Sequence, residues 1–267
     1  MPGRSAPVGF GTRAMIVMLR PTGSMAGSIG IKKIHSALEF WDAVNHLGDQ
    51  QSFYLLEQYV PGDIYHVDTI TYEKELLFSI ASKYGRPPME VSHSGDVFTT
   101  RTLAEGSTEE KELRCLNLDV LKAFGMVRGV SHSEFIKAHD GKLYFLETSA
   151  RVGGAHIADL VEAATGINLW GEWAKVEIAG GKTPYAVAPI RNDYAGLLIS
   201  LARQEWPDTS AYQDPEIVWR MNDKPHHVGL IIRSQDPDRI QQLINEYVQR
   251  FHTDFFASAP PKDKPSS

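Results

Sequence analysis

Cysteine is almost absent from this sequence, which has Cys115 as its single copy in 267 residues. One cysteine excludes a disulfide framework and a zinc site built from several thiolates. No apolar run reaches the roughly 18 residues that a membrane-spanning helix needs. The apolar run at residues 14–19 is too short for the core of a signal peptide. These absences predict a cytoplasmic protein that does not enter a membrane.

Positive charge is also in short supply. Lysine and arginine total 27 against 33 aspartates and glutamates, so the formal net charge is −6. A protein that binds nucleic acid on its own is normally basic, so this balance disfavours a nucleic-acid partner. The chain is 42% hydrophobic and 22% charged, with both signs mixed. That composition excludes a disordered chain and favours one large domain or two small ones.

Patterns of helix caps and alternating strands divide the chain. Residues 1–14 are rich in Pro and Gly, and residues 259–267 are rich in Pro, Lys and Ser; both segments are expected to lie outside the folded part. Capping boxes at Ser36 and Ser107 predict two helix starts, and Asp236 followed by proline predicts a third. Hairpin turns outnumber strand–helix–strand crossovers, so the predicted fold class is α+β with mainly antiparallel strands.

The predicted segments suggest a main domain and a smaller one. Two prolines and few apolar residues mark the chain around residues 185–193. We therefore expect a main domain at residues 15–184 and a small C-terminal α+β subdomain at residues 185–258. Within the main domain, the polar stretch at residues 82–102 is expected to be a loop over the functional site.

Two glutamates lie on either side of a strong turn signal. Asp140-Gly141 between two strand-like runs predicts a hairpin. A loop of two or four residues centred on this dipeptide places Glu134 directly opposite Glu147. Side chains in such a pair are about 5 Å apart at Cβ, and like charges there destabilise the hairpin. The pair therefore needs a neutralising group if it is not simply solvated.

Three arrangements would neutralise this pair. One carboxylate can hold a proton, a nearby cation such as an arginine can bridge both, or a hard divalent metal can bind between them. In the expected register Ile136 and Phe145 share the face of the two glutamates, so this face is predicted to be partly buried. An unpaired carboxylate is costly in such a place, which argues against two merely solvated side chains.

Several blocks, in order along the chain, resemble the ATP-grasp superfamily, which includes biotin carboxylase, carbamoyl phosphate synthetase and carboxylate–amine ligases. The blocks are Arg20-Pro21 with the glycine-rich run at 23–30, the segment 55–62 (LLEQYVPG), and Glu134 with the segment 147–151 (ETSAR). The resemblance extends over about residues 15–182. It implies antiparallel sheets packed with helices, with residues 15–184 as a partial ATP-grasp domain.

The resemblance implies a set of metal ligands. Glu134 and Glu147 correspond to the acidic pair that binds magnesium, with manganese as the alternative ion. Ser149 stands where the family usually has asparagine. Arg151 is similar to the family arginine and is expected to bind a carboxylate or the γ-phosphate, and Lys83 resembles a lysine that reaches phosphate in related ligases.

The resemblance also implies nucleotide contacts. A hinge strand reads adenine through its backbone, while Glu57 accepts a hydrogen bond from the adenine amino group. Small residues let backbone amides approach phosphate oxygens. Arg20 replaces the usual lysine and keeps the charge with a different geometry, and Asp63 and His66 are candidates for the ribose. The full set of expected nucleotide-binding positions is Arg20, Gly27, Ser28, Gly30, Glu57, Tyr59, Val60, Asp63 and His66.

The implied function is an ATP- and magnesium-dependent ligase that activates a small carboxylate or amino acid as an acyl phosphate for attack by an amine. Family members carry a further domain before the Arg20-Pro21 position, where this chain has only twenty residues before Pro21. The expectation is therefore an inactive chain by itself, with a separate chain that carries the N-terminal domain, or a second copy in a homodimer, as its expected protein partner.

Two alternatives remain open at this stage. The first is a non-catalytic nucleotide-binding fragment or one subunit of a split ATP-grasp enzyme, which the altered Arg20 and Ser149 motivate. The second is a hydrolase that uses the two glutamates as acid and base and turns over without ATP. Reading the DNA upstream of the gene would separate a misassigned start from a two-chain enzyme.

Overall fold

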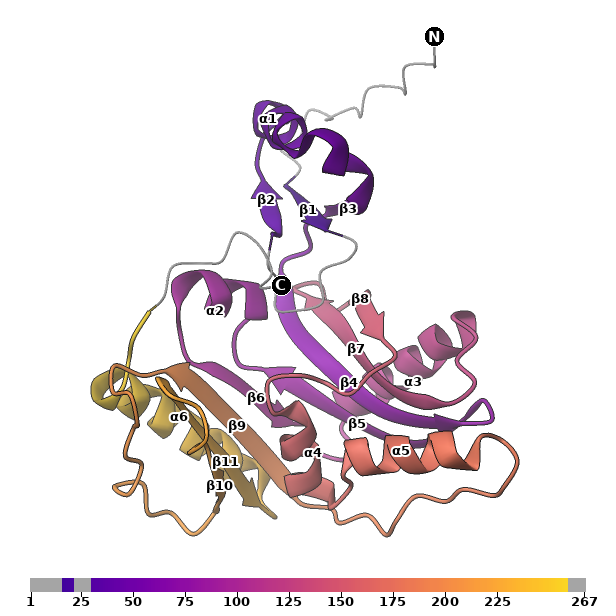
Figure 1. Ribbon diagram of the computed structural model, residues 1–267, viewed down its shortest axis with the longest axis vertical. Helices are drawn as coiled ribbons and strands as arrows, with labels where there is room; N and C mark the ends of the chain where they lie inside the picture. The colour runs from indigo at the N-terminus through magenta and orange to yellow at the C-terminus, as the bar shows by residue number, and fades with distance from the viewer. Residues whose placement is uncertain (1–15, 22–29, 259–267) are drawn as a thin grey trace. The chain divides into compact units, whose positions relative to one another are not determined.

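A computed structural model describes residues 16–21 and 30–258 (Figure 1). The chain divides into two compact units with a boundary between Pro61 and Gly62. We call the described residues up to 61 the small unit and residues 62–258 the large unit. In the described part of the chain, no helix combines the length and the apolar character that crossing a membrane requires.

The small unit is a three-stranded antiparallel sheet with one α-helix. The strands follow the order β2 (Lys32–Ile34), β1 (Val17–Pro21) and β3 (Tyr54–Gln58). Helix α1 (Ala37–Leu47) leads into a 3₁₀ turn, η1 (Gly48–Phe53). Ser36 caps α1 as predicted, because its hydroxyl accepts a hydrogen bond from the Glu39 amide at 3.2 Å. Val17, Leu19, Ile34 and Phe40 form the buried core.

The large unit is built on one eight-stranded sheet in which all neighbouring strands run antiparallel. The predicted α+β class with mainly antiparallel strands is therefore confirmed. The strand order, with bounds, is β10 (Ile217–Arg220), β11 (His227–Ser234), β9 (Tyr194–Leu201), β6 (Phe98–Thr102), β5 (Glu75–Tyr84), β4 (Gly62–Tyr72), β7 (Gly129–Ala138) and β8 (Leu143–Ser149).

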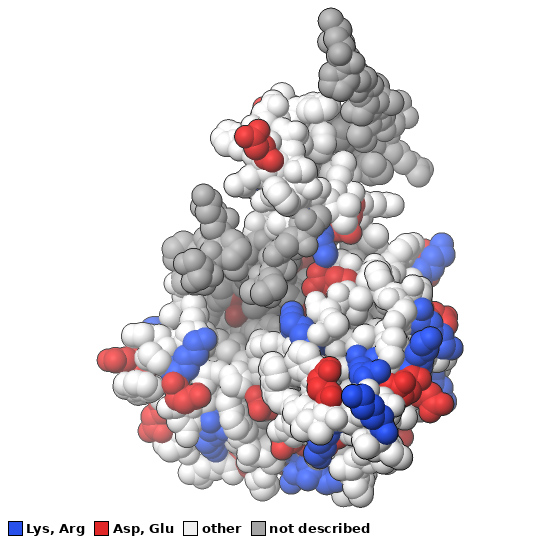
Figure 2. All heavy atoms as spheres, turned by 45° about the vertical axis from the view of Figure 1, so that its right-hand side comes forward, with Lys and Arg blue, Asp and Glu red and all other residues white. Residues whose placement is uncertain are grey.

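Helices cover both faces of this sheet (Figure 1). Helices α4 (Ile157–Thr165) and α5 (Leu169–Ala179) pack on one face, and α3 (Thr108–Ala123) and α6 (Pro237–Asp254) pack on the other. Alternation along β9 produces the two layers: Leu197 joins the cluster beneath α4, whereas the next residue, Leu198, joins the cluster beneath α6. On the surface drawn in Figure 2, acidic and basic side chains of the large unit are interspersed.

The stretch expected as a loop over the site is largely regular structure, which corrects the prediction. It contains α2 (Pro88–Ser94) and β6. Strand β6 pairs with β5 on one side and with β9 on the other. Its sequence, FTTRT, has the β-branched residues that favour strands, but it lacks the alternation of apolar and polar residues by which strands are recognised. The Thr102 hydroxyl accepts a hydrogen bond from the Ala195 amide at 3.1 Å.

Because β6 lies between β5 and β9, it joins the expected C-terminal subdomain to the main sheet. The segment expected as a separate subdomain, residues 185–258, contributes β9, β10, β11 and α6 to the same sheet and its helical layers. The division into compact units falls instead at Pro61 and Gly62. Strand pairing across the whole sheet therefore joins segments that the composition of the chain sets apart.

The β7–β8 hairpin places Glu134 opposite Glu147, as predicted, but by a different route. The loop consists of residues 139–141, and Gly141 has φ +85°, the geometry of a three-residue hairpin loop. A bulge between Glu134 and Phe135 then shifts the register back. Phe145 consequently lies opposite Phe135 and contacts Phe124 of the α3 side, so its predicted place on the glutamate face is wrong.

Gly141→Ala is expected to lower the free energy of unfolding by about 1–2 kcal/mol, because an L-residue pays this amount in the left-handed region. A Cβ at position 141 would meet no atom within 4 Å, so only backbone strain contributes. Gly154→Ala is the matched control, since it has equal space and no positive φ. Urea titrations followed by circular dichroism measure both variants, and equal unfolding midpoints would contradict the expectation.

Candidate functional site

The central feature of the candidate site is the pair formed by Glu134 of β7 and Glu147 of β8. Both lie on the sheet face that α4 and α5 cover, where Ile136 and Leu146 pack with Ile157 of α4. The side chain of Glu134 is only 16% exposed. Glu147, opposite it in the register, is partly buried, so the pair lies at a place that is only partly open to water.

Two neighbouring side chains hold Glu134 in position. The Tyr84 hydroxyl of β5 donates a hydrogen bond to Glu134 Oε1 at 2.7 Å. Nε2 of His132 lies 3.5 Å from the same oxygen. Both partners use Oε1, so Oε2 of Glu134 has no hydrogen-bond partner among the residues that the structure describes. This second oxygen is the one that can act as a ligand.

Glu134 remains ionised in this environment. Burial by itself raises the pKa of Glu134, but the hydrogen bonds from His132 and Tyr84 and the charge of His132 outweigh burial and hold this pKa below its usual value. A proton on Glu134, one of the three arrangements considered from the sequence, is therefore disfavoured. The cation beside Glu134 is the histidine His132, and not an arginine.

Behind Glu134 lies a buried group of His66, Asp68 and His132. Asp68 Oδ2 accepts a hydrogen bond from His66 Nδ1 at 2.8 Å, and Asp68 Oδ1 accepts one from His132 Nδ1 at 2.9 Å. The other ring nitrogen of His66 is 2.8 Å from Thr100 Oγ1. His66 and Asp68 are fully buried and His132 is 6% exposed. We call these three residues the His–Asp–His cluster.

The His–Asp–His cluster carries a buried positive and a buried negative charge. Burial lowers the pKa of His132, but the Asp68 carboxylate outweighs this effect and raises the pKa to about 10. Conversely, burial raises the pKa of Asp68, and the two histidines bring it well below its usual range. The three side chains are metal-ligating types that converge. Each Asp68 oxygen, however, already accepts a histidine hydrogen bond, so hydrogen bonding accounts for the arrangement.

Sequence reasoning missed Asp68, although a local signal for the cluster exists. His66 and Asp68 are two residues apart on β4, and His132 and Glu134 are two residues apart on β7. Residues two apart on a strand point to the same face. Because His66 pairs with Glu134 and Asp68 pairs with His132, the two His-x-acid motifs form one block. Only the pairing of β4 with β7, which spans many residues, reveals it.

The segment after β8 closes over this cluster. Ser149, the expected third metal ligand, lies opposite His132 at the end of β8. Arg151 donates from Nη1 to the Val152 carbonyl at 2.9 Å. A Cβ at Gly153 would lie 2.9 Å from Nδ1 of His132 and 3.0 Å from Oδ1 of Asp68. Glycine is therefore needed there for the backbone to approach the cluster so closely.

Two other expected site residues of the large unit, Lys83 and Asp63, are not brought together with the glutamate pair. Lys83 pairs with Tyr65 on the opposite sheet face, and its Nζ is 2.7 Å from Asp63 Oδ2. This follows from strand alternation, since Lys83 is adjacent to Tyr84, which points to Glu134. His66 lies on the face of Glu134 but is fully buried within the cluster.

The small unit holds the remaining expected nucleotide-binding positions. Arg20 Nε lies 3.6 Å from Glu57 Oε2, and strand pairing puts both residues on the sheet face that does not carry the core. Lys33, which sequence reasoning did not single out, lies with Nζ 3.7 Å from the ring centroid of Tyr59. Val60 follows Tyr59, and Gly30 has φ +76°. Gly27 and Ser28 lie outside the described residues.

The donor atoms of the glutamate pair suit a hard divalent cation. Glu134 Oε2, the Glu147 carboxylate and the Ser149 hydroxyl are oxygen donors on one hairpin. Magnesium prefers oxygen ligands and is usually held by one or two carboxylates together with substrate phosphates. The residues present therefore fit magnesium, and the opposed carboxylates explain why a cation would be favoured there.

The sequence resembles some characterised proteins, although no protein-family profile matches it. It is 22% identical over 214 residues to an L-arginine-specific L-amino acid ligase of Bacillus subtilis. That match covers 74% of this chain and 51% of the ligase, so the chain spans about half the length of this curated relative.

Solved structures share the fold at low sequence identity. An L-amino acid ligase from Bacillus licheniformis matches with a TM-score of 0.62 at 15% identity, over 92% of this chain and 64% of that one. Carboxyaminoimidazole ribonucleotide synthase from Aspergillus clavatus, complexed with ATP, matches with a TM-score of 0.66 at 12% identity, over 88% and 63%. The chain thus shares the fold of these ligase and synthase structures, which agrees with the predicted resemblance to the ATP-grasp fold.

Proposed function

We propose that this chain forms the nucleotide- and metal-binding part of an ATP-dependent ligase that activates a carboxylate as an acyl phosphate for attack by an amine. The observation that carries the proposal is the direct opposition of Glu134 and Glu147 on neighbouring strands, with Oε2 of Glu134 left available. The similarity to an L-amino acid ligase supports the carboxylate–amine class and a small carboxylate or amino acid as substrate.

In this proposal Glu134, Glu147 and Ser149 hold magnesium, or manganese in its place. The bound ion would supply neutralisation of negative charge on the nucleotide phosphates. Tyr84 and His132 fix the orientation of Glu134 through its Oε1 atom. Such partners of a metal-ligating carboxylate set its geometry and basicity.

The proposal also gives the two arginines a role. Arg151 binds a substrate carboxylate or the γ-phosphate, and Arg20 binds a phosphate. Glu57, Tyr59 and Val60 remain the proposed adenine hinge, and Gly27, Ser28 and Gly30 remain proposed phosphate contacts. Lys83, Asp63 and His66 stay predictions of the sequence alone, because their surroundings in the large unit give the proposal no support.

A second candidate is a non-catalytic nucleotide-binding chain or one subunit of a split enzyme. Ser149 and Arg20, which replace the expected asparagine and lysine, favour it. Both candidates bind a nucleotide, but only the ligase converts ATP to ADP. ADP release that depends on added carboxylate and amine supports the ligase, whereas binding without such release supports the second candidate.

Calorimetry of ATP binding with and without magnesium tests the shared part of the proposal. The unsubstituted chain is expected to bind ATP at least about tenfold more tightly with magnesium, a difference of about 1.4 kcal/mol. Glu147→Gln keeps the shape of the side chain and removes its charge, so this difference is expected to vanish.

The control is Glu73→Gln, which alters a half-exposed ion pair with Arg128 and is expected to keep the magnesium effect. Circular dichroism of each variant checks that the fold is intact. Equal affinity of the unsubstituted chain for ATP in the presence and absence of magnesium would refute the proposed metal site.

A further inference from the structure

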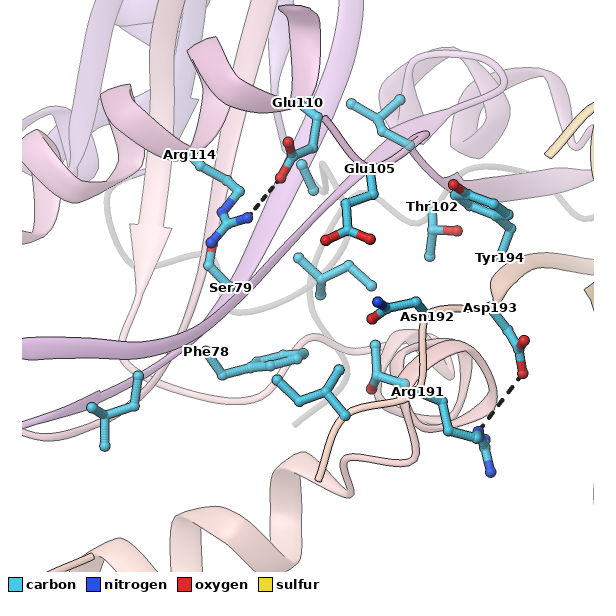
Figure 3. A pocket seen from close by; sticks show the side chains of 16 residues that line it. Phe78, Ser79, Thr102, Glu105, Glu110, Arg114, Arg191, Asn192, Asp193 and Tyr194 are labelled. Carbon is cyan, nitrogen blue, oxygen red and sulfur yellow. Dashed lines mark hydrogen bonds and ion pairs between the residues drawn. The ribbon is translucent and has the colours of Figure 1, made fainter. Parts of the chain in front are cut away.

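A cavity of about 230 Å³ opens in the large sheet where β6 ends (Figure 3). Strand β6 stops at Thr102 and pairs with only residues 82–84 of β5. The preceding part of β5, residues 77–81, therefore has no strand beside it on that side. The chain leading into β9 lines the opposite wall, and α3 contributes Glu110 and Arg114. The cavity is a gap beside β5 that is partly open to solvent.

Strand geometry directs backbone groups into this gap. The Ala81 carbonyl accepts a hydrogen bond from the Leu103 amide at 2.9 Å, so the backbone groups of Ala81 point to the β6 side. In an antiparallel strand the N–H and C=O of every second residue point the same way. The backbone N–H and C=O of Ser79 consequently face the cavity, where β6 no longer supplies partners.

The side chain of Ser79 adds another polar atom without a partner. Its Oγ is buried and makes no hydrogen bond to a described residue. A buried polar group without a partner costs about 1–3 kcal/mol, and native proteins normally satisfy such groups with water or a ligand. This Oγ is enclosed by the protein, so the acceptor that Ser79 offers to a molecule in the cavity is its backbone carbonyl.

The charges lining the cavity leave one carboxylate uncompensated. Glu110 is paired with Arg114 at 2.9 Å, and Asp193 lies 3.7 Å from Arg191. Glu105 makes neither a hydrogen bond nor an ion pair with any residue in the described part of the chain. Figure 3 shows its carboxylate pointing into the space between Thr102 and Asn192. The unpaired charge in the lining is thus negative.

Apolar side chains form the rest of the wall beside these acceptors. Ile80 and Leu103 line the cavity, and Leu103 is buried. A short aliphatic chain would gain about 25 cal/mol for each Å² that it buries against them. A cation that donates hydrogen bonds would be attracted by the Glu105 carboxylate and by the Ser79 backbone carbonyl. A molecule that has both a short aliphatic chain and a hydrogen-bond-donating cation fits both parts of the lining.

We propose that this cavity binds a small organic ammonium compound, with the ammonium group at Glu105 and Ser79 and its aliphatic part against Ile80 and Leu103. The site shares no residue with the glutamate pair or the His–Asp–His cluster. It is therefore independent of the proposed ligase function and would remain if that function failed.

Ligand-observed NMR with the full chain tests the proposal, with n-butylamine at pH 7.5 as the probe. Saturable binding in the millimolar range is expected for a ligand of this size. Butan-1-ol lacks the charge and butanoate reverses it, so both are expected to bind at least tenfold more weakly. Equal binding of butan-1-ol and n-butylamine, or no saturable binding of the amine, would overturn the proposal.

Two matched variants locate the binding. Glu105→Gln is expected to weaken n-butylamine binding at least tenfold, and it should fold normally because Glu105 is exposed at the cavity mouth. Glu112→Gln changes an exposed glutamate of α3 that does not line the cavity, and it is expected to leave the affinity unchanged. Unaltered binding to Glu105→Gln would overturn the proposal. Magnesium–ATP affinity should be the same in both variants, which separates this result from the test of the ligase function.

Discussion

Asp68→Asn is expected to lower the free energy of unfolding by about 3–5 kcal/mol, the usual cost of removing one partner of a buried ion pair. Asp68 is fully buried and accepts hydrogen bonds from both His66 and His132. Asparagine has nearly the same shape, so the loss comes from charge and hydrogen bonding. The His132 imidazolium would lose its main counterion, and one of the two acceptor oxygens would become a donor. Urea unfolding followed by circular dichroism measures the change.

The loss should depend on pH in a defined direction. Folding raises the pKa of His132 from 6.5 to about 10, so its contribution is complete below pH 6.5 and is lost as the pH rises through about 10. Folding lowers the pKa of Asp68, so its contribution is present above its unfolded value of about 3.9 and is lost as the pH falls. The difference between the unsubstituted chain and Asp68→Asn should therefore be largest at about pH 4 to 6.5 and decline toward pH 10.

Asp63→Asn provides the control on the same strand. Asp63 pairs with Lys83 at 2.7 Å, but its side chain is 62% exposed. Exposed ion pairs contribute about 0–1 kcal/mol, so this variant is expected to lose less than about 1 kcal/mol. Similar losses for Asp68→Asn and Asp63→Asn would contradict the view that the His–Asp–His cluster is a buried charged unit.

Phe251→Ala is expected to lower the free energy of unfolding by about 3–5 kcal/mol through a cavity beneath α6. Phe251 is fully buried, and its ring contacts Tyr212 and Phe255 with centroids 5.7 and 5.5 Å away. These aromatic rings hold α6 against β9 and β11 in one core cluster. The same urea titrations measure the loss.

Phe124→Ala tests whether burial causes this loss. Phe124 is 67% exposed at the end of α3, where its ring centroid is 6.0 Å from that of Phe145. Exposed substitutions usually change stability by about 0.5 kcal/mol or less, so the control is expected to lose under about 1 kcal/mol. If both phenylalanine variants lost the same amount, the aromatic cluster would not be the stabilising feature.

Local signals in the sequence predicted the helix starts well. Ser36, Ser107 and Asp236 cap α1, α3 and α6 as expected. Each cap depends on a hydrogen bond between residues two or three positions apart, so nothing beyond the neighbouring chain is needed to specify it. The opposition of Glu134 and Glu147 was also predicted from one hairpin, but the three-residue loop alone would shift the pairing, and the bulge restores it.

Predictions that depended on the details of register were weaker. The loop at Gly141 and the bulge at Glu134 and Phe135 compensate each other, which preserved the glutamate pair and moved Phe145 to the other face. A shift of one residue exchanges the faces of a strand. The pattern of the two strands alone does not contain this bulge.

The sequence by itself determined the α+β class, the helix caps and the motifs of the ATP-grasp resemblance, because each is encoded in short segments. Only the tertiary structure decided the central place of β6, the union of residues 185–258 with the main sheet, and the meeting of His66 and Asp68 with His132. The cavity at Glu105 belongs to the same group, since it exists only where β6 ends between two longer strands. These features depend on pairing between distant strands, whose stability comes from the burial of the whole sheet rather than from the preferences of any one segment.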